Sequence, residues 1–287
     1  MSVPEEAVAT SLPAGSQGRL VICPTPIGNL GDVTLRALDA LRGADTIACE
    51  DTRRTRVLLD RYQIAGTLVS FHEHNEDTRA SQLAERIDGG DVVVLVSDAG
   101  MPLVSDPGYA LVRACLHAGL PVEVLPGPSS VTTAVVASAL PAQRWRFVGF
   151  LPRRGAGSTR GELARLLADT PETLIAFESP GRLAATLALL AELDPLRPVA
   201  VCRELTKLHE EVRRGPAAEL AAHYREHPPR GEIVVVVGAA TADAAGREDA
   251  IAALRELVDA GARPRAAAAV VAKLTKLGAN ELYRSLI

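Results

Sequence analysis

The chain has 287 residues, a length typical of two domains of about 120–150 residues or of one larger α/β domain. Hydrophobic residues make up 47% and charged residues 23% of it, a mixture that excludes a disordered chain and is typical of a globular protein. The net charge of −4, from 31 basic and 35 acidic residues, argues against a protein that coats nucleic acid without selection.

The sequence also argues against a secreted or membrane protein. Its apolar runs are much shorter than the roughly 18 residues that a membrane-spanning helix needs. Residues 1–18 include Glu5 and Glu6 and lack a basic, apolar leader, so we expect a flexible tail there rather than a signal peptide. The four cysteines show no paired spacing, which predicts a reduced, cytoplasmic protein; they are Cys23, Cys49, Cys115 and Cys202.

In the first half of the chain, short β-branched runs without polar alternation predict strands at residues 20–23, 92–96 and 122–125. Strands of this kind are buried on both faces, as in parallel sheets covered by helices. Helical patterns separate them at residues 34–42, 53–62, 78–87, 109–118 and 131–139. This alternation predicts an α/β domain over residues 19–145.

Pro141 ends the last of these helices, and the second half repeats the same pattern. Strands are predicted at residues 174–177, 199–201 and 233–237, with helices at 182–193 and 216–224. We therefore expect a second α/β domain over residues 146–240, again with a mostly parallel sheet. A linker at 238–246 and a small helical extension over residues 248–287 complete the predicted architecture.

Four loops rich in Gly and Pro follow predicted strands, at residues 24–32, 97–108, 126–130 and 178–182. In open α/β sheets, ligands bind beyond the carboxyl ends of the strands, where glycines allow close approach of the backbone. The loops therefore predict a crevice for a small molecule, although ordinary strand-to-helix turns remain the alternative.

Two other patterns are weaker. Residues 155–161 resemble a dinucleotide fingerprint, but the spacing is one residue too long and Pro152 precedes it, which argues against a nicotinamide or flavin site. His72 and His74 flank Glu73, yet no third ligand follows at metal-binding spacing, so we expect no metal.

A basic segment at residues 144–168 stands out in an otherwise acidic chain. It has six arginines against Glu162 alone, which indicates either a contact with a polyanion or a solvated loop. The arginines are Arg144, Arg146, Arg153, Arg154, Arg160 and Arg165.

Eight segments, in order along the chain, resemble the tetrapyrrole methylase superfamily, and most closely its branch that modifies ribosomal RNA. One departure is Gly181, because the family usually has histidine at this place in the motif Glu178-Ser-Pro-Gly-Arg182. The matching segments are 20–32, 49–53, 71–76, 95–108, 126–130, 178–182, 203–210 and 231–237.

The resemblance implies two α/β domains with S-adenosylmethionine in the cleft between them, and a homodimer. It implies methylation of the ribose 2′-oxygen of a cytidine in small-subunit ribosomal RNA, either free or in the assembled subunit. Two alternatives stay open: a C-methyltransferase acting on a tetrapyrrole, and a non-catalytic RNA-binding factor for ribosome assembly.

The resemblance also implies roles for residues. Glu178 or Lys207 could act as the general base, with no single base as the alternative. The expected cofactor contacts are Asp98, Ala99, Gly100, Pro102, Ser129, Ser130, Phe177, Glu178, Leu205, Gly231, Glu232 and Ile233. The expected RNA contacts are Arg53, Glu73, Asn75, Arg153, Arg154, Arg182 and Glu210.

Overall fold

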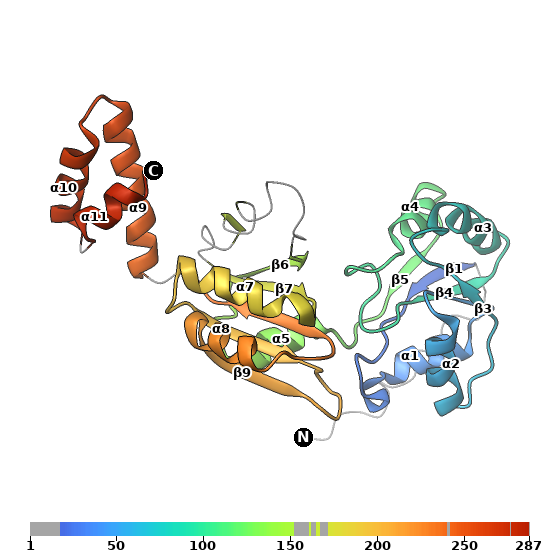
Figure 1. Cartoon of the computed structure of the whole chain (residues 1–287). Coiled ribbons are helices and arrows are strands. Elements are labelled where there is room, and N and C mark those ends of the chain that lie inside the picture. Colours follow the sequence, from blue (N-terminus) through green and yellow to red (C-terminus); the bar gives the residue numbers. More distant parts are fainter. Residues whose placement is uncertain are drawn as a thin grey trace, which may run out of the picture. The chain divides into compact units, whose positions relative to one another are not determined.

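The computed structural model describes residues 18–151, 161, 165–166, 172–239, 242–275 and 277–286. By its internal contacts the chain divides into two compact units, Met1–Thr133 and Ala134–Ile287. Figure 1 shows a sheet flanked by helices in each unit, and a separate group of helices near the C-terminus.

The first unit is built on a five-stranded, fully parallel sheet in the order β3-β2-β4-β1-β5. As predicted, its strands alternate with helices. In chain order these are β1 (Arg19–Ile22), a short 3-10 helix (Leu30–Asp32), α1 (Leu35–Arg42), β2 (Thr46–Cys49), α2 (Thr52–Arg61), β3 (Leu68–Ser70), α3 (Glu76–Asp88), β4 (Val92–Val96), α4 (Tyr109–His117), β5 (Val122–Val124) and α5 (Ser130–Ser138).

Helices cover both faces of this sheet. On β4, Val94 and Val96 pack in a cluster with residues of α1 and α2, whereas Val93 and Leu95 pack in a second cluster with residues of α3 and α4. Successive side chains of a strand point to opposite faces, so a strand that is covered on both sides needs an unbroken apolar run. The sheet thereby sets the loops after β1, β4 and β5 along one edge, at the carboxyl ends of its strands.

The second unit has a five-stranded sheet in the order β6-β7-β10-β8-β9. Helices α7 and α8 pack together with one face of this sheet in a single hydrophobic cluster, which includes Leu187, Leu220 and Val235. The elements are β6 (Trp145–Phe150), β7 (Thr173–Glu178), α7 (Pro180–Leu193), β8 (Pro198–Arg203), β9 (Glu211–Pro216), α8 (Ala217–Glu226) and β10 (Ile233–Val237).

The prediction of a mostly parallel second sheet is wrong. Among its described strands, only β6 and β7 pair in parallel; β10 pairs antiparallel with β7 and β8, and β8 pairs antiparallel with β9. The apolar runs of β8 and β10 report burial on both faces, but they carry no information on strand direction. A short loop joins β8 to β9, and a connection of that length suits only an antiparallel pair.

The chain passes from the first unit to the second within α5, before the boundary that the sequence placed near residue 145. Residues in the C-terminal half of this helix contact strands of the second sheet: Cys202 Sγ lies 4.0 Å from Ala134 O, and the Arg214 guanidinium donates to Ala137 O. These contacts explain why Ala134 groups with the second unit.

Three helices near the C-terminus have a small hydrophobic core of their own, centred on Leu254, Ala268, Val271 and Leu282. They are α9 (Ala242–Asp259), α10 (Pro264–Leu274) and α11 (Ala279–Arg284). The predicted helical extension is therefore present, but the predicted linker at 238–246 is wrong in part, because its last residues form the start of α9.

All four cysteines are buried and form no disulfide. Among the described residues, no helix is both long and apolar enough to cross a membrane.

Candidate functional site

The loops after β1 and β4 are joined into one structure at the edge of the first sheet. The backbone of Thr25 pairs with that of Gly100 in both directions at 2.9 Å, and the Thr25 hydroxyl donates to Ser97 O at 3.1 Å. Ser97 in turn donates its hydroxyl to Gly100 O. Gly100 has φ of +82°, a conformation that side chains make costly, so the loop depends on this glycine.

The loop after β5 packs closely against the same structure. A Cβ added at Gly127 would lie 2.5 Å from Pro24 Cγ, and one added at Gly100 would lie 3.8 Å from Pro128 O. Ser129 and Ser130 follow at the start of α5, where Ser129 O accepts a bond from the Thr133 hydroxyl. Three of the four predicted loops are thus brought together within the first unit, with backbone groups at their centre.

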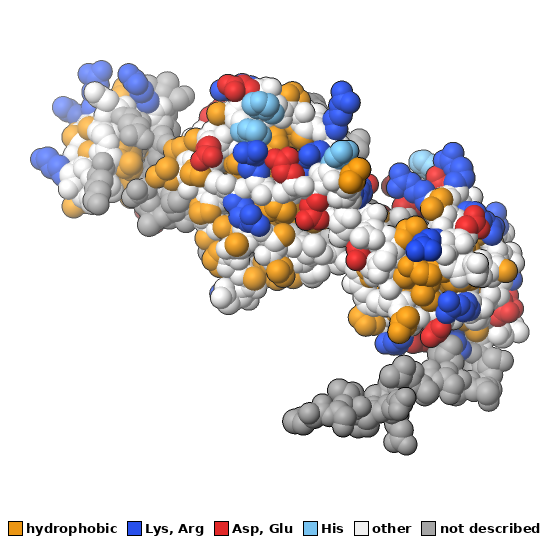
Figure 2. Space-filling model, turned by 90° about the horizontal axis from the view of Figure 1, so that it is seen from below, with side chains coloured by type: hydrophobic (Ala, Val, Ile, Leu, Met, Phe, Trp, Pro, Cys, Tyr) orange, Lys and Arg blue, Asp and Glu red, His pale blue; other side chains and the backbone are white. Residues whose placement is uncertain are grey.

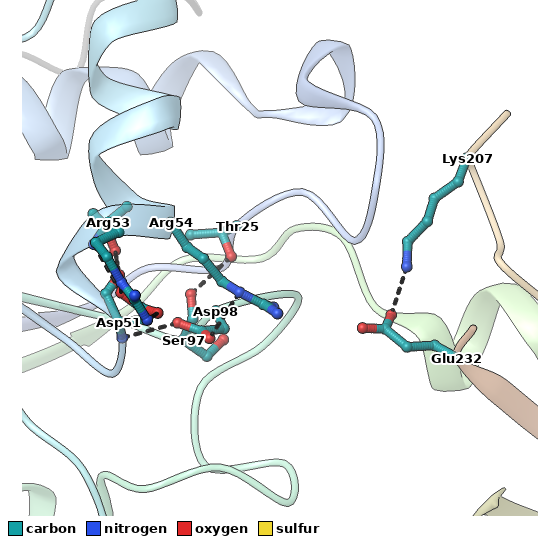
Figure 3. Close-up of polar contacts among 9 residues, drawn as sticks. Thr25, Asp51, Arg53, Arg54, Ser97, Asp98, Lys207 and Glu232 are labelled. Atoms are coloured by element: carbon teal, nitrogen blue, oxygen red, sulfur yellow. Dashed lines mark hydrogen bonds and ion pairs between the residues drawn. The ribbon is translucent and has the colours of Figure 1, made fainter. Parts of the chain in front are cut away.

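Carboxylates gather beside these loops (Figure 3). The backbone N–H of Asp51 donates to Asp98 Oδ1 at 3.0 Å, and Arg54 Nε lies 3.4 Å from Asp98 Oδ2. Asp98 was expected to contact the cofactor, but both of its oxygens have partners within the unit. Its side chain therefore holds the loop after β4 to the start of α2.

Arg53 was expected to contact RNA and instead pairs with Asp51 in this structure. Its guanidinium donates to both carboxylate oxygens, at 3.0 and 2.7 Å, while its backbone N–H donates to Asp51 Oδ1, which caps α2. These bonds lower the pKa of the Asp51 carboxyl to about 2. The Arg53 side chain remains 89% exposed, so its outer surface is open to a phosphate.

Asp106, which the sequence did not single out, has unusual electrostatics. Burial raises the pKa of its carboxyl from 3.8 to about 6, and the charges of Glu50 and Asp98 add to the shift. Burial also raises the pKa of Glu50. The two carboxyls come from the loops after β4 and β2, so only folding brings them together. The sequence contains only a slight indication of this cluster, namely that Asp98 and Asp106 lie in one loop that is rich in Gly and Pro.

The raised pKa of Asp106 makes a testable difference to stability. Ionisation of this carboxyl opposes folding, so its contribution to stability is complete below about pH 4 and is lost as the pH rises through about 6. After allowance for partial exposure, Asp106→Asn is expected to raise the free energy of unfolding by about 1–2 kcal/mol at pH 8 and to change little at pH 4.

Urea titrations at the two pH values measure this difference. The exposed Asp88→Asn, at the end of α3, serves as the control for loss of one negative charge. If Asp106→Asn were less stable than the parent at pH 8, the carboxylate would be making favourable bonds, contrary to the stated cause of the shift.

The loop at residues 72–76 is a structural connection. Asn75 Oδ1 accepts from His72 N at 2.9 Å, and its amide donates to Ser70 O at 3.3 Å. Glu76 accepts the N–H groups of Gly108 and Ala110 and so ties this loop to the one after β4. Asn75, an expected RNA contact, is therefore used by the fold, whereas Glu73 is exposed.

No group of three potential metal ligands is found among the described residues. The rings of His72 and His74 lie 5.9 Å apart, edge to face.

Glu178 lies at the centre of a buried network in the second unit. Its side chain is 1% exposed. Oε1 accepts from Ser179 N and Arg182 Nε, both at 2.7 Å, and Oε2 accepts from the Thr186 hydroxyl at 2.7 Å. Arg182 also donates to Leu151 O. This geometry favours a role in holding α7 to β7 and lends no support to proton abstraction by Glu178.

The other expected cofactor contacts of this unit lie around Glu178. Ile233 pairs with Glu178 on one side and with Arg203 on the other, and Leu205 is buried just beyond β8. The ring of Phe177 packs edge-on against Phe147 and Phe150, with centroids 4.9 and 5.3 Å apart. The carboxyl end of β7 and the ends of its neighbours thus form a second group of candidate residues.

Lys207, the other expected base, is held as an ammonium ion (Figure 3). Its Nζ lies 2.8 Å from Glu204 Oε1 and 2.9 Å from Glu232 Oε2. Burial alone would lower the pKa of Lys207, but the two carboxylates outweigh it and the pKa is raised. A charged lysine cannot accept a proton, so the structure favours a positioning role for Lys207.

Glycine is required next to this ion pair. Gly231 has φ of +92°, and a Cβ there would lie 2.5 Å from the Glu204 carboxyl. Glu204 Oε1 also accepts the N–H of Glu232, and Glu210 Oε2 accepts the N–H of Thr206. Carboxylates at both ends of the loop after β8, those of Glu204 and Glu210, therefore hold this loop in place through hydrogen bonds to backbone N–H groups. In this structure Glu210 stabilises the loop.

Two sequence expectations lie outside the described residues: Arg153 and Arg154, as well as the fingerprint-like residues 155–161 apart from Gly161. Gly181 is in the first turn of α7, where an added Cβ would meet open space. A side chain at this position, such as the histidine usual in the family, would therefore begin in open space.

Comparisons with known proteins agree with the fold. The family model for tetrapyrrole (corrin/porphyrin) methylases matches residues 19–221. Similar solved structures include a uroporphyrin-III C-methyltransferase from Thermus thermophilus, with 23% identity, a TM-score of 0.57 and coverage of 81% of this chain and 97% of that one. A cobalt precorrin-4 methyltransferase has 18% identity and a TM-score of 0.59, over 77% and 94%. At these identities they share the fold alone.

Curated relatives are much more similar. "Ribosomal RNA small subunit methyltransferase I" of Mesorhizobium japonicum is 46% identical over 97% of this chain and 95% of its own length. The protein of the same name from Escherichia coli O157:H7 is 42% identical over 94% of both. That of Thermotoga maritima is 46% identical over 77% of this chain and 98% of its own length. The chain therefore belongs to the tetrapyrrole (corrin/porphyrin) methylase family, in the branch that contains these relatives.

Proposed function

We propose that this protein is an S-adenosylmethionine-dependent methyltransferase that modifies the ribose 2′-oxygen of a cytidine in small-subunit ribosomal RNA. The observation that carries the proposal is 46% identity, over nearly the whole of both chains, to a ribosomal RNA small subunit methyltransferase I. The RNA specificity is taken from that name, and the 2′-oxygen of cytidine from the family resemblance.

The loops of the first unit suit such a cofactor. Gly127 lies against Pro24 with no room for a side chain, and Gly100 has a positive φ, so backbone groups can approach a ligand closely. Glu50, Asp98 and Asp106 supply negative charge close by, which suits a sulfonium cation. We propose that these loops of the first unit form part of the cofactor site.

When bound, S-adenosylmethionine supplies an activated methyl group. The chain must then align the ribose hydroxyl with that methyl and take up the hydroxyl proton, and alignment alone can provide much of the acceleration. Glu178 is buried and fully bonded, and Lys207 is already protonated. Asp106, with a pKa of about 6, is suited to proton exchange near neutral pH, and we propose it as the acceptor.

This role predicts opposite effects on stability and activity in one variant. Asp106→Asn, more stable at pH 8, should lose turnover by about 100-fold or more, since the amide cannot take the proton. Unchanged turnover would exclude Asp106 as the acceptor without affecting the wider proposal.

We further propose that the protein works as a homodimer, as the resemblance implies, and that it works in the cytoplasm, as the unpaired spacing of its cysteines predicts. Two other functions are open alternatives. A tetrapyrrole C-methyltransferase is an alternative that the structural neighbours bring to mind, but at 23% identity or less they share the fold alone. A non-catalytic assembly factor would keep the fold but transfer no methyl group.

One experiment separates the three functions. Purified protein is incubated with methyl-labelled S-adenosylmethionine and either small subunits, free small-subunit RNA or uroporphyrinogen III, and nucleosides are then analysed by mass spectrometry. The proposal expects a labelled 2′-O-methylcytidine from RNA. Label in the tetrapyrrole alone supports the second function, and RNA binding without label supports the third.

The basic segment gives a further prediction. Arginine binds phosphate through a planar fork of donors, and removal of one arginine–phosphate pairing should reduce the slope of log affinity against log salt by about 0.7–0.9. Arg153→Ala with Arg154→Ala is therefore expected to flatten the salt dependence of RNA binding, measured over a salt series. Cofactor affinity, measured by calorimetry on the same protein, should stay unchanged; an unaltered slope would mean a solvated loop.

A further inference from the structure

The last part of the chain differs in charge from the rest. Residues 263–287 include five basic residues and Glu281 as the one acidic residue, in a protein whose net charge is −4. They also contain two of the three lysines of the chain. The basic residues are Arg263, Arg265, Lys273, Lys276 and Arg284.

The basic side chains on α10 and α11 are available to a partner. Arg263, Lys273 and Arg284 are exposed, and none of them pairs with a carboxylate in the part of the chain that the structure describes. Arg265 packs over the Tyr283 ring at 5.3 Å and so links α10 to α11. Figure 2 shows Lys and Arg side chains projecting from the C-terminal helices, at the left of the view.

This charge is not needed for folding of the helices. Their core is apolar and contains Leu254, Val271 and Leu282, whereas the charges lie outside it. Three basic residues lie in the two short helices, and Arg263 directly precedes α10. Exposed basic side chains repel one another, so this set lowers stability unless an anionic partner offsets the repulsion. Exposed apolar side chains accompany them, with Leu274 82% and Val270 53% exposed.

The C-terminal helices lie outside the family match and have a hydrophobic core of their own. The family match ends at residue 221, before α9 begins. The Thermotoga maritima relative, matched over 98% of its own length, corresponds to only 77% of this chain. The C-terminal helices therefore add something to the methyltransferase rather than forming part of its catalytic body.

We propose that α9–α11 form an accessory RNA-binding module, in which Arg263, Lys273 and Arg284 contact phosphates of small-subunit ribosomal RNA. The substrate class rests on the proposed function. RNA is favoured over a protein partner because the charged side chains described as exposed on and beside α10 and α11 are all basic and mainly arginine. Arginine pairs with phosphate in the plane of its fork. The module raises affinity for the substrate and takes no part in methyl transfer.

The test uses the full-length protein with Arg263→Ala, Lys273→Ala and Arg284→Ala combined. Arg265 is retained because it links two helices. Binding to free small-subunit RNA and to assembled subunits is measured over a salt series. The salt slope should fall by about 2–3, and the dissociation constant at physiological salt should rise about tenfold or more. KM for RNA should rise with kcat unchanged, and cofactor affinity should stay constant.

The matched control removes three positive charges elsewhere, with Arg42→Ala, Arg86→Ala and Arg225→Ala. Arg42 and Arg86 already pair with Asp39 and Asp91 on the surface, and such pairs contribute little. An equal fall of the slope in the control would mean that only total charge matters, and would overturn the proposal.

Two other results would also overturn it. One is an unaltered salt slope in the first triple variant. The other is weaker binding to assembled subunits with unchanged binding to free RNA, which would indicate a ribosomal protein as the partner. Absence of methyl transfer by the parent protein would refute the proposed function alone, since the RNA-binding comparison is independent of turnover.

Discussion

Replacing Gly127 with alanine is expected to lower the affinity for S-adenosylmethionine by about 100-fold or more. The added Cβ would lie 2.5 Å from Pro24 Cγ and 3.1 Å from Pro24 Cβ. A proline ring cannot rotate away, so the loop after β5 must separate from the loop after β1. Overpacking of this kind typically costs about 1–3 kcal/mol, and about 2.7 kcal/mol corresponds to a hundredfold change in affinity.

Calorimetry with the cofactor, alongside thermal unfolding, measures this effect. Gly43→Ala is the matched control, because its Cβ would lie at an ordinary 3.5 Å from Asp39 O, in the turn before β2. That turn is at the amino end of its strand, on the opposite edge of the sheet. Equal cofactor affinity in the two variants would contradict the assignment of the first unit's loops to the cofactor site.

Glu178→Ala is expected to reduce the free energy of unfolding by about 3–5 kcal/mol. The substitution leaves the partly buried Arg182 guanidinium, the Ser179 N–H and the Thr186 hydroxyl without their acceptor. Breaking a buried ion pair by removal of one partner has a cost of this size, because the remaining charge is left uncompensated.

Glu178→Gln distinguishes a structural role from a catalytic one. The amide keeps the shape and one acceptor oxygen, so the loss should be only about 1–2 kcal/mol, and the folded variant should retain turnover. Denaturant unfolding and a pH–rate profile are measured on both variants. A stable glutamine variant that loses turnover and one limb of the pH profile would restore Glu178 as the general base.

Several strands could be predicted from the sequence almost to the residue. Leu20, Val94 and Val235 lie in unbroken apolar runs, and the structure places all three in strands that are covered on both faces. Strands β2, β3 and β9 were not predicted. The first two have only four and three residues, and β9 contains Arg213 and Arg214 because it is an edge strand with a face open to water.

The positions of the candidate loops were also predictable, because strand ends and Gly/Pro clusters can be read from the sequence. The pKa values and hydrogen-bond partners of the side chains were not predictable. Asp106 acquires its raised pKa from burial and from Glu50, which is far from it in sequence. Asn75 and Glu210 have the polarity expected of RNA contacts, but their hydrogen bonds close the loops in which they lie. Such pairings depend on tertiary packing, which residue type alone does not specify.

The buried cysteines allow the opening of each unit to be followed chemically. Burial raises the pKa of Cys23 to about 12, and those of Cys115 and Cys202 to about 11. Because the thiolate is the reactive form, alkylating reagents can modify these groups only after local or global opening. Cys23 and Cys115 lie in the first unit and Cys202 in the second. Labelling rates resolved by peptide mass would therefore compare how often the two halves open, and whether added cofactor protects both.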